Sequence, residues 1–172
     1  MKTEKSQTIA PDESLERLGE LLKNIQYCML TSVEKDGALR SRPMYTLNRD
    51  FDGKLWFFTA NDSGKVEEIQ TDTQVNLSYV STDQRKFVSV SGKAAILQDR
   101  GKMADFWHPT YRAWFPGGVE DPNLRLICVE VDHAEYWESP STFLARLSVL
   151  AMQVIGSDTN LSGDNQKIQV AK

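Results

Sequence analysis

Apolar positions near the start of the chain recur mostly every three or four residues, which is the spacing of an amphipathic helix. Over the segment 12–24 this spacing places the leucines on one stripe and the charged residues opposite. After Tyr27 the period changes to two, which is typical of strands with one buried face. The change of period predicts a helix that packs on a sheet.

Alternating segments then predict six strands, at 27–33, 39–47, 54–60, 74–81, 86–97 and 124–137. Lys35-Asp36-Gly37 is a turn that joins the first two strands as a hairpin, and we expect the first three strands to form a meander. The third strand contains Leu55-Trp56-Phe57-Phe58. Such an unbroken apolar run is typical of a strand that is covered on both faces.

Helical spacing returns at 65–71, where Ser63 is expected to cap the helix, at 99–107 and at 140–154. These helices surround the strands and do not alternate with all of them. That order favours a mainly β (α+β) fold, an antiparallel barrel with peripheral helices, over a doubly wound parallel sheet.

The 172 residues are close to the size of one domain. We expect a flexible N-terminus over 1–13, one folded domain over 14–155, and a disordered tail over 156–172, which has no aromatic residue and few apolar ones. The net charge of −4 provides no positive field to attract nucleic acid. No apolar run approaches the roughly 20 residues that span a bilayer, and no secretion signal is evident, so we expect a cytoplasmic protein without a membrane partner.

Cysteine and histidine indicate no metal chemistry. Cys28 and Cys128 each lie inside an apolar run and are expected to be buried free thiols. His108 and His133 lack the spacing of metal ligands, so no metal site is predicted. The paired acids Glu67 and Glu68 lie on a predicted helix, where such charges are usually solvated.

The strongest chemical signal is the segment 58–65, a strand end followed by a loop that opens a helix. The N–H groups and the positive dipole end of a helix N-terminus stabilise an anion. Lys65 would add a positive charge, and Thr59 and Ser63 would add hydroxyl donors. The same segment is compatible with an ordinary capped helix and a solvated lysine.

The second predicted strand carries Arg40 and Arg42 on one face, where they could pair with acidic groups or bind an anion. Pro43 removes a ladder donor, so it marks an edge, a bulge or a place where a ligand approaches the backbone. Further along, the segment 107–118 alternates aromatic residues with turn formers. It could form a lid over a flat ligand, plug the end of the barrel or pack at a subunit interface.

Taken in chain order, these features resemble the flavin-binding split β-barrels related to pyridoxamine 5'-phosphate oxidase, and within them the general stress protein branch. The resemblance runs from about Leu15 to Trp137 and rests on Arg42-Pro43-Met44, on 55–59 with Ser63 and Lys65, on 88–94 and on Tyr136-Trp137. It implies a six-stranded split barrel and a homodimer with two FMN sites at the subunit interface, with FAD as a possible alternative cofactor.

The resemblance also implies roles for particular residues. Those at 42–44 would run beside the flavin ring and ribityl chain, the hydroxyls and the lysine of 59–65 would hold the phosphate, and a tryptophan would reach the ring edge from the partner subunit. The expected cofactor-binding residues are Arg42, Pro43, Met44, Phe58, Thr59, Ser63, Lys65 and Trp137. No catalytic residue is identified.

Departures from the oxidase limit the activity that is expected. Gly64 stands where the oxidase has an arginine, Phe87 where it has a glutamine and Leu47 where it has a lysine, and no histidine follows Trp137. We therefore expect no pyridoxamine phosphate oxidase activity. A flavin-dependent oxidoreductase of unknown substrate is the first hypothesis, and a non-catalytic flavin-storage or redox-sensing protein is the second. Haem or a deazaflavin is a third ligand hypothesis.

Overall fold

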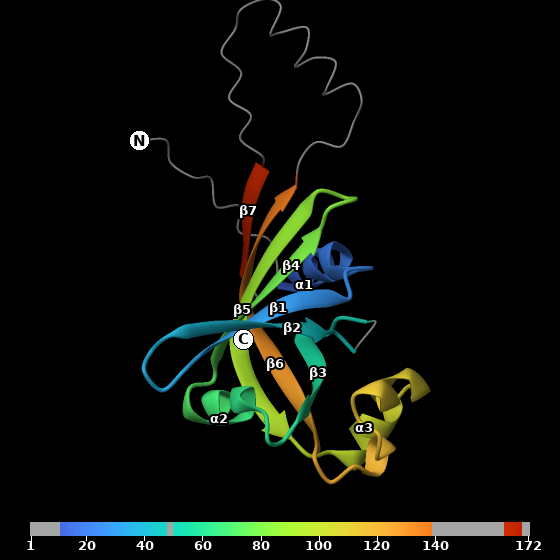
Figure 1. Ribbon diagram of the computed structural model, residues 1–172. Helices are drawn as coiled ribbons and strands as arrows, with labels where there is room; N and C mark the ends of the chain where they lie inside the picture. Colours follow the sequence, from blue (N-terminus) through green and yellow to red (C-terminus); the bar gives the residue numbers. More distant parts are fainter. Residues whose placement is uncertain (1–10, 48–49, 139–163, 170–172) are drawn as a thin grey trace, which may run out of the picture.

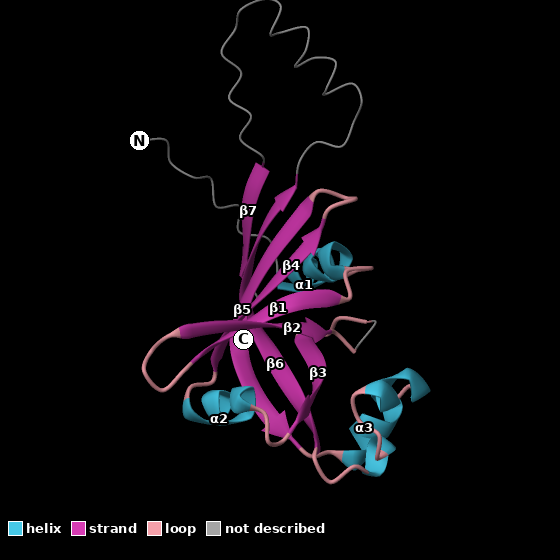
Figure 2. Cartoon of the chain, viewed as in Figure 1, coloured by secondary structure: helices cyan, strands magenta, loops and turns pink. Residues whose placement is uncertain are grey.

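The computed structural model describes residues 11–47, 50–138 and 164–169. Within these residues an antiparallel sheet of seven strands forms the body of the molecule, and helices lie at its periphery (Figures 1 and 2). The strands are β1 (Tyr27–Val33), β2 (Leu39–Tyr45), β3 (Lys54–Ala60), β4 (Gln74–Ser81), β5 (Lys86–Leu97), β6 (Leu124–Glu138) and β7 (Asp164–Gln169). The helices are α1 (Pro11–Leu22), α2 (Gly64–Thr71) and α3 (Arg100–Phe106), with short 3-10 turns η1 (Pro109–Ala113) and η2 (Gly118–Glu120).

The strand order explains the split shape of the barrel. The path is β2-β1-β4-β5-β6-β3, and β7 pairs with β6 off this path. The two ends of the path, β2 and β3, share no ladder, although the amide of Leu47 donates to the carbonyl of Trp56 at 2.9 Å just beyond β2. The sheet therefore curls without closing, which confirms the prediction of an antiparallel split barrel with peripheral helices. The predicted number of six strands is exceeded by one, because β7 adds to β6.

The prediction of a meander over the first three strands is wrong. β1 and β2 form the expected hairpin, but β3 crosses to the other end of the path and pairs with β6 from Lys54 to Ala60. The physical reason lies in burial. β3 has apolar side chains on both faces, and beside the long β6 two hydrophobic clusters cover both of them.

Two hydrophobic clusters meet at β3. Leu55 and Phe57 point into the main core with the leucines of α1, such as Leu18 and Leu21. Trp56 belongs to the second cluster, where Phe58 packs against it together with α3 and the N-terminal end of β6. The unbroken apolar run is thus buried on both sides, as the sequence predicts.

A bulge in β6, opposite Gly92 of β5, lets this pair of strands serve both halves of the barrel. The register with β6 shifts between Ser91 and Gly92, and an added Cβ at Gly92 would collide with the backbone carbonyl of Glu130. The extra residue is Asp132 of β6, since Ser91 pairs with His133 and Gly92 with Val131. A bulge bends its strand and increases the local twist, so β6 and the 12 residues of β5 can follow the curve of the sheet. Glycine is required here because the neighbouring backbone approaches too closely for any side chain.

The C-terminal segment differs from the expectation of disorder. Residues 164–169 form β7, which pairs with β6 from Glu138 to His133, and Ile168 is buried in the main core. Composition misjudges this segment because its stability comes from ladder hydrogen bonds to β6 and from one apolar side chain. At the other end, α1 begins at Pro11, inside the segment expected to be flexible. The helix predicted at 140–154 lies outside the described residues.

Candidate anion-binding site

Three side chains predicted to act together do converge where β3 leads into α2. The Lys65 Nζ lies 3.3 Å from the Thr59 Oγ1 and 3.4 Å from the Ser63 Oγ, and the two hydroxyl oxygens are 3.0 Å apart. Thr59 is 1% exposed at the end of β3, while Lys65 lies in the first turn of α2. We call these three residues the cradle. Their juxtaposition is confirmed, and their role toward a ligand stays a prediction.

Ser63 occupies the N-cap position of α2, but its hydroxyl does not cap the helix. The hydroxyl lies with Thr59 and Lys65, and the first helical bond runs from the amide of Val66 to the Ser63 carbonyl at 2.9 Å. The expectation that the Ser63 side chain caps the helix is therefore wrong. The hydroxyl instead adds a polar group to the cradle, beside the positive end of the helix dipole.

The charge of Lys65 is poorly compensated by the protein. Burial lowers the pKa of Lys65, and the nearby positive charge of Arg42 lowers it further, while Glu68 acts in the opposite direction. The hydroxyls of the cradle accept hydrogen bonds but carry no negative charge. An anion bound here would offset the cost of holding this ammonium group away from water.

Arg42 lies close to the cradle but is held by a carboxylate. Its Nη2 donates to both oxygens of Glu68, at 2.6 and 2.7 Å, and its Nη1 donates to the Ser32 Oγ at 2.7 Å. The Ser32 hydroxyl in turn donates to Glu68 at 2.6 Å. The side chains of Arg42 and Glu68 are 18% and 11% exposed. Arg40 pairs with Glu34, so both arginines of β2 take the acid-pairing alternative in this structure.

Glu68 and Ser32 are site residues that sequence reasoning missed. The reading of Glu67 and Glu68 as solvated charges holds for Glu67, which is exposed and pairs with the exposed Lys35. It is wrong for Glu68. The two neighbours differ because Glu68 faces the sheet from α2, and the available signal was a helical position close to the buried Ile69 and Val66.

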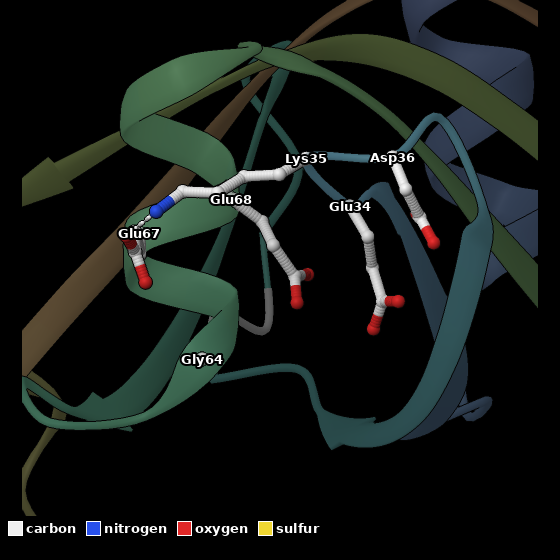
Figure 3. A pocket seen from close by; sticks show the side chains of 6 residues that line it. All are labelled: Glu34, Lys35, Asp36, Gly64, Glu67 and Glu68. Carbon is white, nitrogen blue, oxygen red and sulfur yellow. Dashed lines mark ion pairs between the residues drawn. The ribbon is translucent and has the colours of Figure 1, made fainter.

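An open acidic pocket of about 370 Å³ adjoins the Arg42 pair. It lies between α2 and the turn after β1, and Glu34, Asp36 and Glu68 point toward the same opening (Figure 3). The complete lining is Glu34, Lys35, Asp36, Gly64, Glu67 and Glu68. Four carboxylates against one ammonium make this pocket unsuitable for an anion. Glu68 thus stands between an acidic opening and a basic cradle.

The other residues expected near a cofactor have different surroundings. Pro43 is exposed on the outer face of β2, while the Met44 side chain is buried in the main core. The Phe58 side chain lies on the opposite face of β3 from Thr59 because successive side chains alternate. It contacts the rings of Trp107, Tyr111 and Phe115, with centroids 5.7, 5.4 and 6.2 Å away.

The aromatic segment 107–118 packs over this second face of β3. Besides Phe58, Tyr111 contacts the ring of Tyr45 from β2 with centroids 6.0 Å apart. Figure 1 shows α3, which leads into this segment, on the other side of β3 and β6 from α2. The segment thus packs against β2 and β3 within its own chain, and its role as a lid, a plug or an interface segment stays a prediction. Trp114 is the exception, since 71% of it is exposed.

Trp137 lies far from the cradle of its own chain. Thr59 pairs with Arg125 on β6, and Trp137 is 12 residues further along that strand. At about 3.3 Å per residue, this is roughly 40 Å of strand. Trp137 pairs with Phe87, which pairs with Val80, so the three share one outer face. Met29 lies on the same face, because its partner Ser78 precedes Val80 by two residues. The Met29 side chain is also exposed.

Further predicted features agree with the described part of the chain. Cys28 and Cys128 are both buried and free, and burial raises the pKa of the Cys28 thiol to about 12. No helix among residues 11–47, 50–138 and 164–169 is long and apolar enough to cross a membrane.

Fold and site together define a split antiparallel barrel with a cradle of one ammonium and two hydroxyls at the start of a helix. Residues 13–160 match the model of the family described as pyridoxamine 5'-phosphate oxidase like. The chain belongs to this family, and its solved relatives include general stress proteins.

Three relatives illustrate the similarity. Protein bli-3 of Neurospora crassa is 29% identical over 154 residues, which cover 84% of this chain and 74% of the relative. The general stress FMN/FAD binding protein of Xanthomonas citri is 30% identical, with a TM-score of 0.65 over 77% of this chain and 93% of that chain. A general stress protein 26 from Jannaschia is 19% identical, with a TM-score of 0.70 over 92% of this chain and 97% of that one, and shows the fold alone.

Proposed function

We propose that this protein binds FMN, with the terminal phosphate held by Thr59, Ser63 and Lys65. The observation that carries the proposal is the convergence of one partly buried ammonium and two hydroxyls at the start of α2. A phosphate monoester carries close to two negative charges and three acceptor oxygens at neutral pH. One cation and two hydroxyls can donate to those oxygens, and the helix dipole adds to the attraction.

The donor set suits a phosphate better than a carboxylate-only or neutral ligand. Because Lys65 lacks a direct acidic partner in the cradle, its charge is available to an incoming anion. The similarity to a protein from Xanthomonas citri that is named for FMN/FAD binding supports a flavin as the carrier of that phosphate. FAD would present a phosphodiester to the same groups, so FMN is the preferred ligand.

We further propose that the active assembly is a homodimer that completes the flavin site. An outer face of the sheet exposes Tyr27, Met29, Val80 and Phe87, with half-buried Trp137 beside them. A contiguous apolar face of this kind is typical of an interaction surface. Because Trp137 is so distant from its own cradle along β6, it can serve a flavin held there only from a partner subunit.

Within this family the bound flavin would supply redox chemistry, accepting and donating electrons. The protein's own residues would bind the phosphate, orient the ring and restrict access of water. We propose a flavin-dependent oxidoreductase of unidentified substrate as the first function. We do not expect oxidation of pyridoxamine phosphate, since both histidines of the chain precede Trp137 and His108 is hydrogen-bonded to Thr110 at 2.8 Å.

The second candidate is flavin binding without turnover, as in storage or redox sensing. The same histidine arrangement favours it, because the substrate-binding half of the oxidase site has no counterpart after Trp137. Addition of NADPH to the flavin-loaded protein under anaerobic conditions distinguishes the two. Bleaching of the flavin absorption at a useful rate would favour the enzyme, whereas persistent absorption would favour the binding protein.

The experiment that tests the proposed cofactor is a visible spectrum of the purified protein, followed by titration with FMN and with riboflavin. We expect flavin bands, or quenching of flavin fluorescence on titration, with FMN bound more tightly than riboflavin. Equal affinity for the two would contradict the phosphate assignment. A colourless protein that binds neither would remove the flavin proposal altogether.

A further inference from the structure

We propose that Glu68 sets the phosphate affinity of the cradle, and its preference between FMN and FAD, by holding Arg42 in an internal ion pair. The inference rests on the proposed function, because it concerns the same phosphate site. It assigns a role in specificity to a residue that does not belong to the cradle itself.

The geometry shows how completely Glu68 engages Arg42. One Nη of the guanidinium faces both carboxylate oxygens, and Ser32 links the other Nη to the same carboxylate. All distances are between 2.6 and 2.7 Å. The pair is mostly buried, so it is weakly screened by solvent. In this arrangement the carboxylate occupies the guanidinium edge that would otherwise suit a phosphate.

The ion pair between Arg42 and Glu68 reduces the positive charge that the cradle offers to a phosphate. Arg42 is near enough to Lys65 for its charge to act on the lysine, so a phosphate on Lys65 also lies within the field of Arg42. Glu68 cancels most of that second positive charge. The cradle therefore offers an incoming phosphate one available cation, Lys65, where two cations are present.

The pair also affects the choice between two flavin cofactors. The terminal phosphate of FMN is a monoester with close to two negative charges, whereas each phosphate of FAD carries one. A site with a single available cation gains less from the second charge of FMN than a site with two available cations would. Releasing Arg42 would strengthen FMN binding more than FAD binding. Glu68 therefore reduces the difference between the affinities for FMN and for FAD.

The test compares Glu68→Gln with Glu67→Gln in the full-length protein. Both substitutions remove one negative charge from neighbouring positions of α2, but Glu67 is exposed and pairs with Lys35 outside the cradle. Dissociation constants are measured for FMN, FAD and riboflavin by quenching of flavin fluorescence, and for inorganic phosphate by calorimetry. Glutamine retains an oxygen that can accept from Arg42, so the fold should survive.

We expect Glu68→Gln to bind FMN about tenfold more tightly, which is the scale of one added charge-assisted contact. FAD affinity should rise by a smaller factor, and riboflavin affinity should stay within about twofold, because it has no phosphate. Glu67→Gln should leave all three affinities within about twofold, since screening weakens the effect of an exposed charge. Unchanged or weaker FMN binding by Glu68→Gln would overturn the proposal, and so would an equal gain for riboflavin.

Failure of the proposed function gives a different result. If the wild-type protein binds no flavin, inorganic phosphate decides the role of Glu68 independently. Tighter phosphate binding by Glu68→Gln would then support the inference, while equal or undetectable binding by both proteins would overturn it. Should thermal melting show that Glu68→Gln is unfolded, Glu68→Asp replaces it. Aspartate keeps the charge but is one methylene shorter, so we expect a smaller gain in FMN affinity, and no gain would overturn the proposal.

Discussion

Replacement of Lys65 by methionine separates a ligand-binding lysine from a structural one. Methionine keeps an unbranched apolar stem of similar length and removes the charge. In the protein without ligand, burial and Arg42 lower the pKa of Lys65, which means that the folded state disfavours the charged form. Below that lowered pKa the ammonium is a net cost to folding, so Lys65→Met should be at least as stable as the wild type at pH 7.

Lys65→Met should weaken FMN binding, although it should not lower the stability of the ligand-free protein. A charge-assisted hydrogen bond to phosphate contributes about 1.5–3 kcal/mol, so Lys65→Met should weaken FMN binding by roughly 10- to 150-fold. Riboflavin should bind to both proteins equally, because it lacks the phosphate. The assays are thermal melting of the ligand-free protein and titration with each flavin, monitored by fluorescence.

Lys35→Met provides the matched control. Lys35 is an exposed lysine beside the acidic pocket, paired with Glu67, so its loss should change neither the melting temperature nor FMN affinity appreciably. The reasoning is refuted if Lys65→Met melts at a clearly lower temperature and binds FMN as tightly as the wild type. That combination would show that Lys65 stabilises the folded protein and does not bind the phosphate.

Three further predictions concern stability, pH and assembly. Gly92→Ala should destabilise the protein by about 2 kcal/mol or more, because the new Cβ collides with the Glu130 carbonyl opposite the β6 bulge. A melting curve that coincides with the wild type would contradict this. Burial raises the pKa of Glu68, but hydrogen bonds from Ser32 and Arg42 and the charges of Arg42 and Arg40 outweigh it, so the pKa is lowered overall. The stability advantage of wild type over Glu68→Gln should therefore be full at pH 7 and lost as the pH falls below about 4.5 through the folded-state pKa. An advantage unchanged down to pH 2, measured by urea unfolding, would argue against it. Trp137→Ala should weaken FMN binding while the exposed Trp114→Ala does not, and titration combined with sedimentation would show whether dimer formation is lost as well; equal affinities would remove Trp137 from the site.

The sequence predicted most elements of the fold because their signals are local. β4 and β5 have the predicted bounds, and the hairpin turn at Lys35-Asp36-Gly37 joins β1 and β2 as expected. Pairing between strands that are distant in the sequence was harder to predict. The partner of β3 depends on which position covers both of its apolar faces, and β7 depends on β6, so neither is encoded in the segment itself.

The candidate site was predictable to a similar extent. Thr59, Ser63 and Lys65 lie within seven residues of sequence, at a junction of strand and helix whose geometry is locally determined. The Arg42 pair joins β2 to α2 across 26 residues of sequence and depends on the docking of α2 against the sheet. Sequence spacing alone could not distinguish the buried Glu68 from the solvated Glu67.

The proposed phosphate site does not depend on an arginine at position 64. Gly64 contributes no side chain to the start of α2, and an added Cβ there would meet only the carboxylate end of Glu68 at 3.6 Å. A second cation nevertheless exists close by in Arg42, delivered from β2 and not from the helix. Its availability is controlled by Glu68, so the affinity of the cradle depends on a competition between a carboxylate of the protein and a phosphate of the ligand. A site of this kind is expected to bind its ligand less tightly than its count of positive side chains suggests.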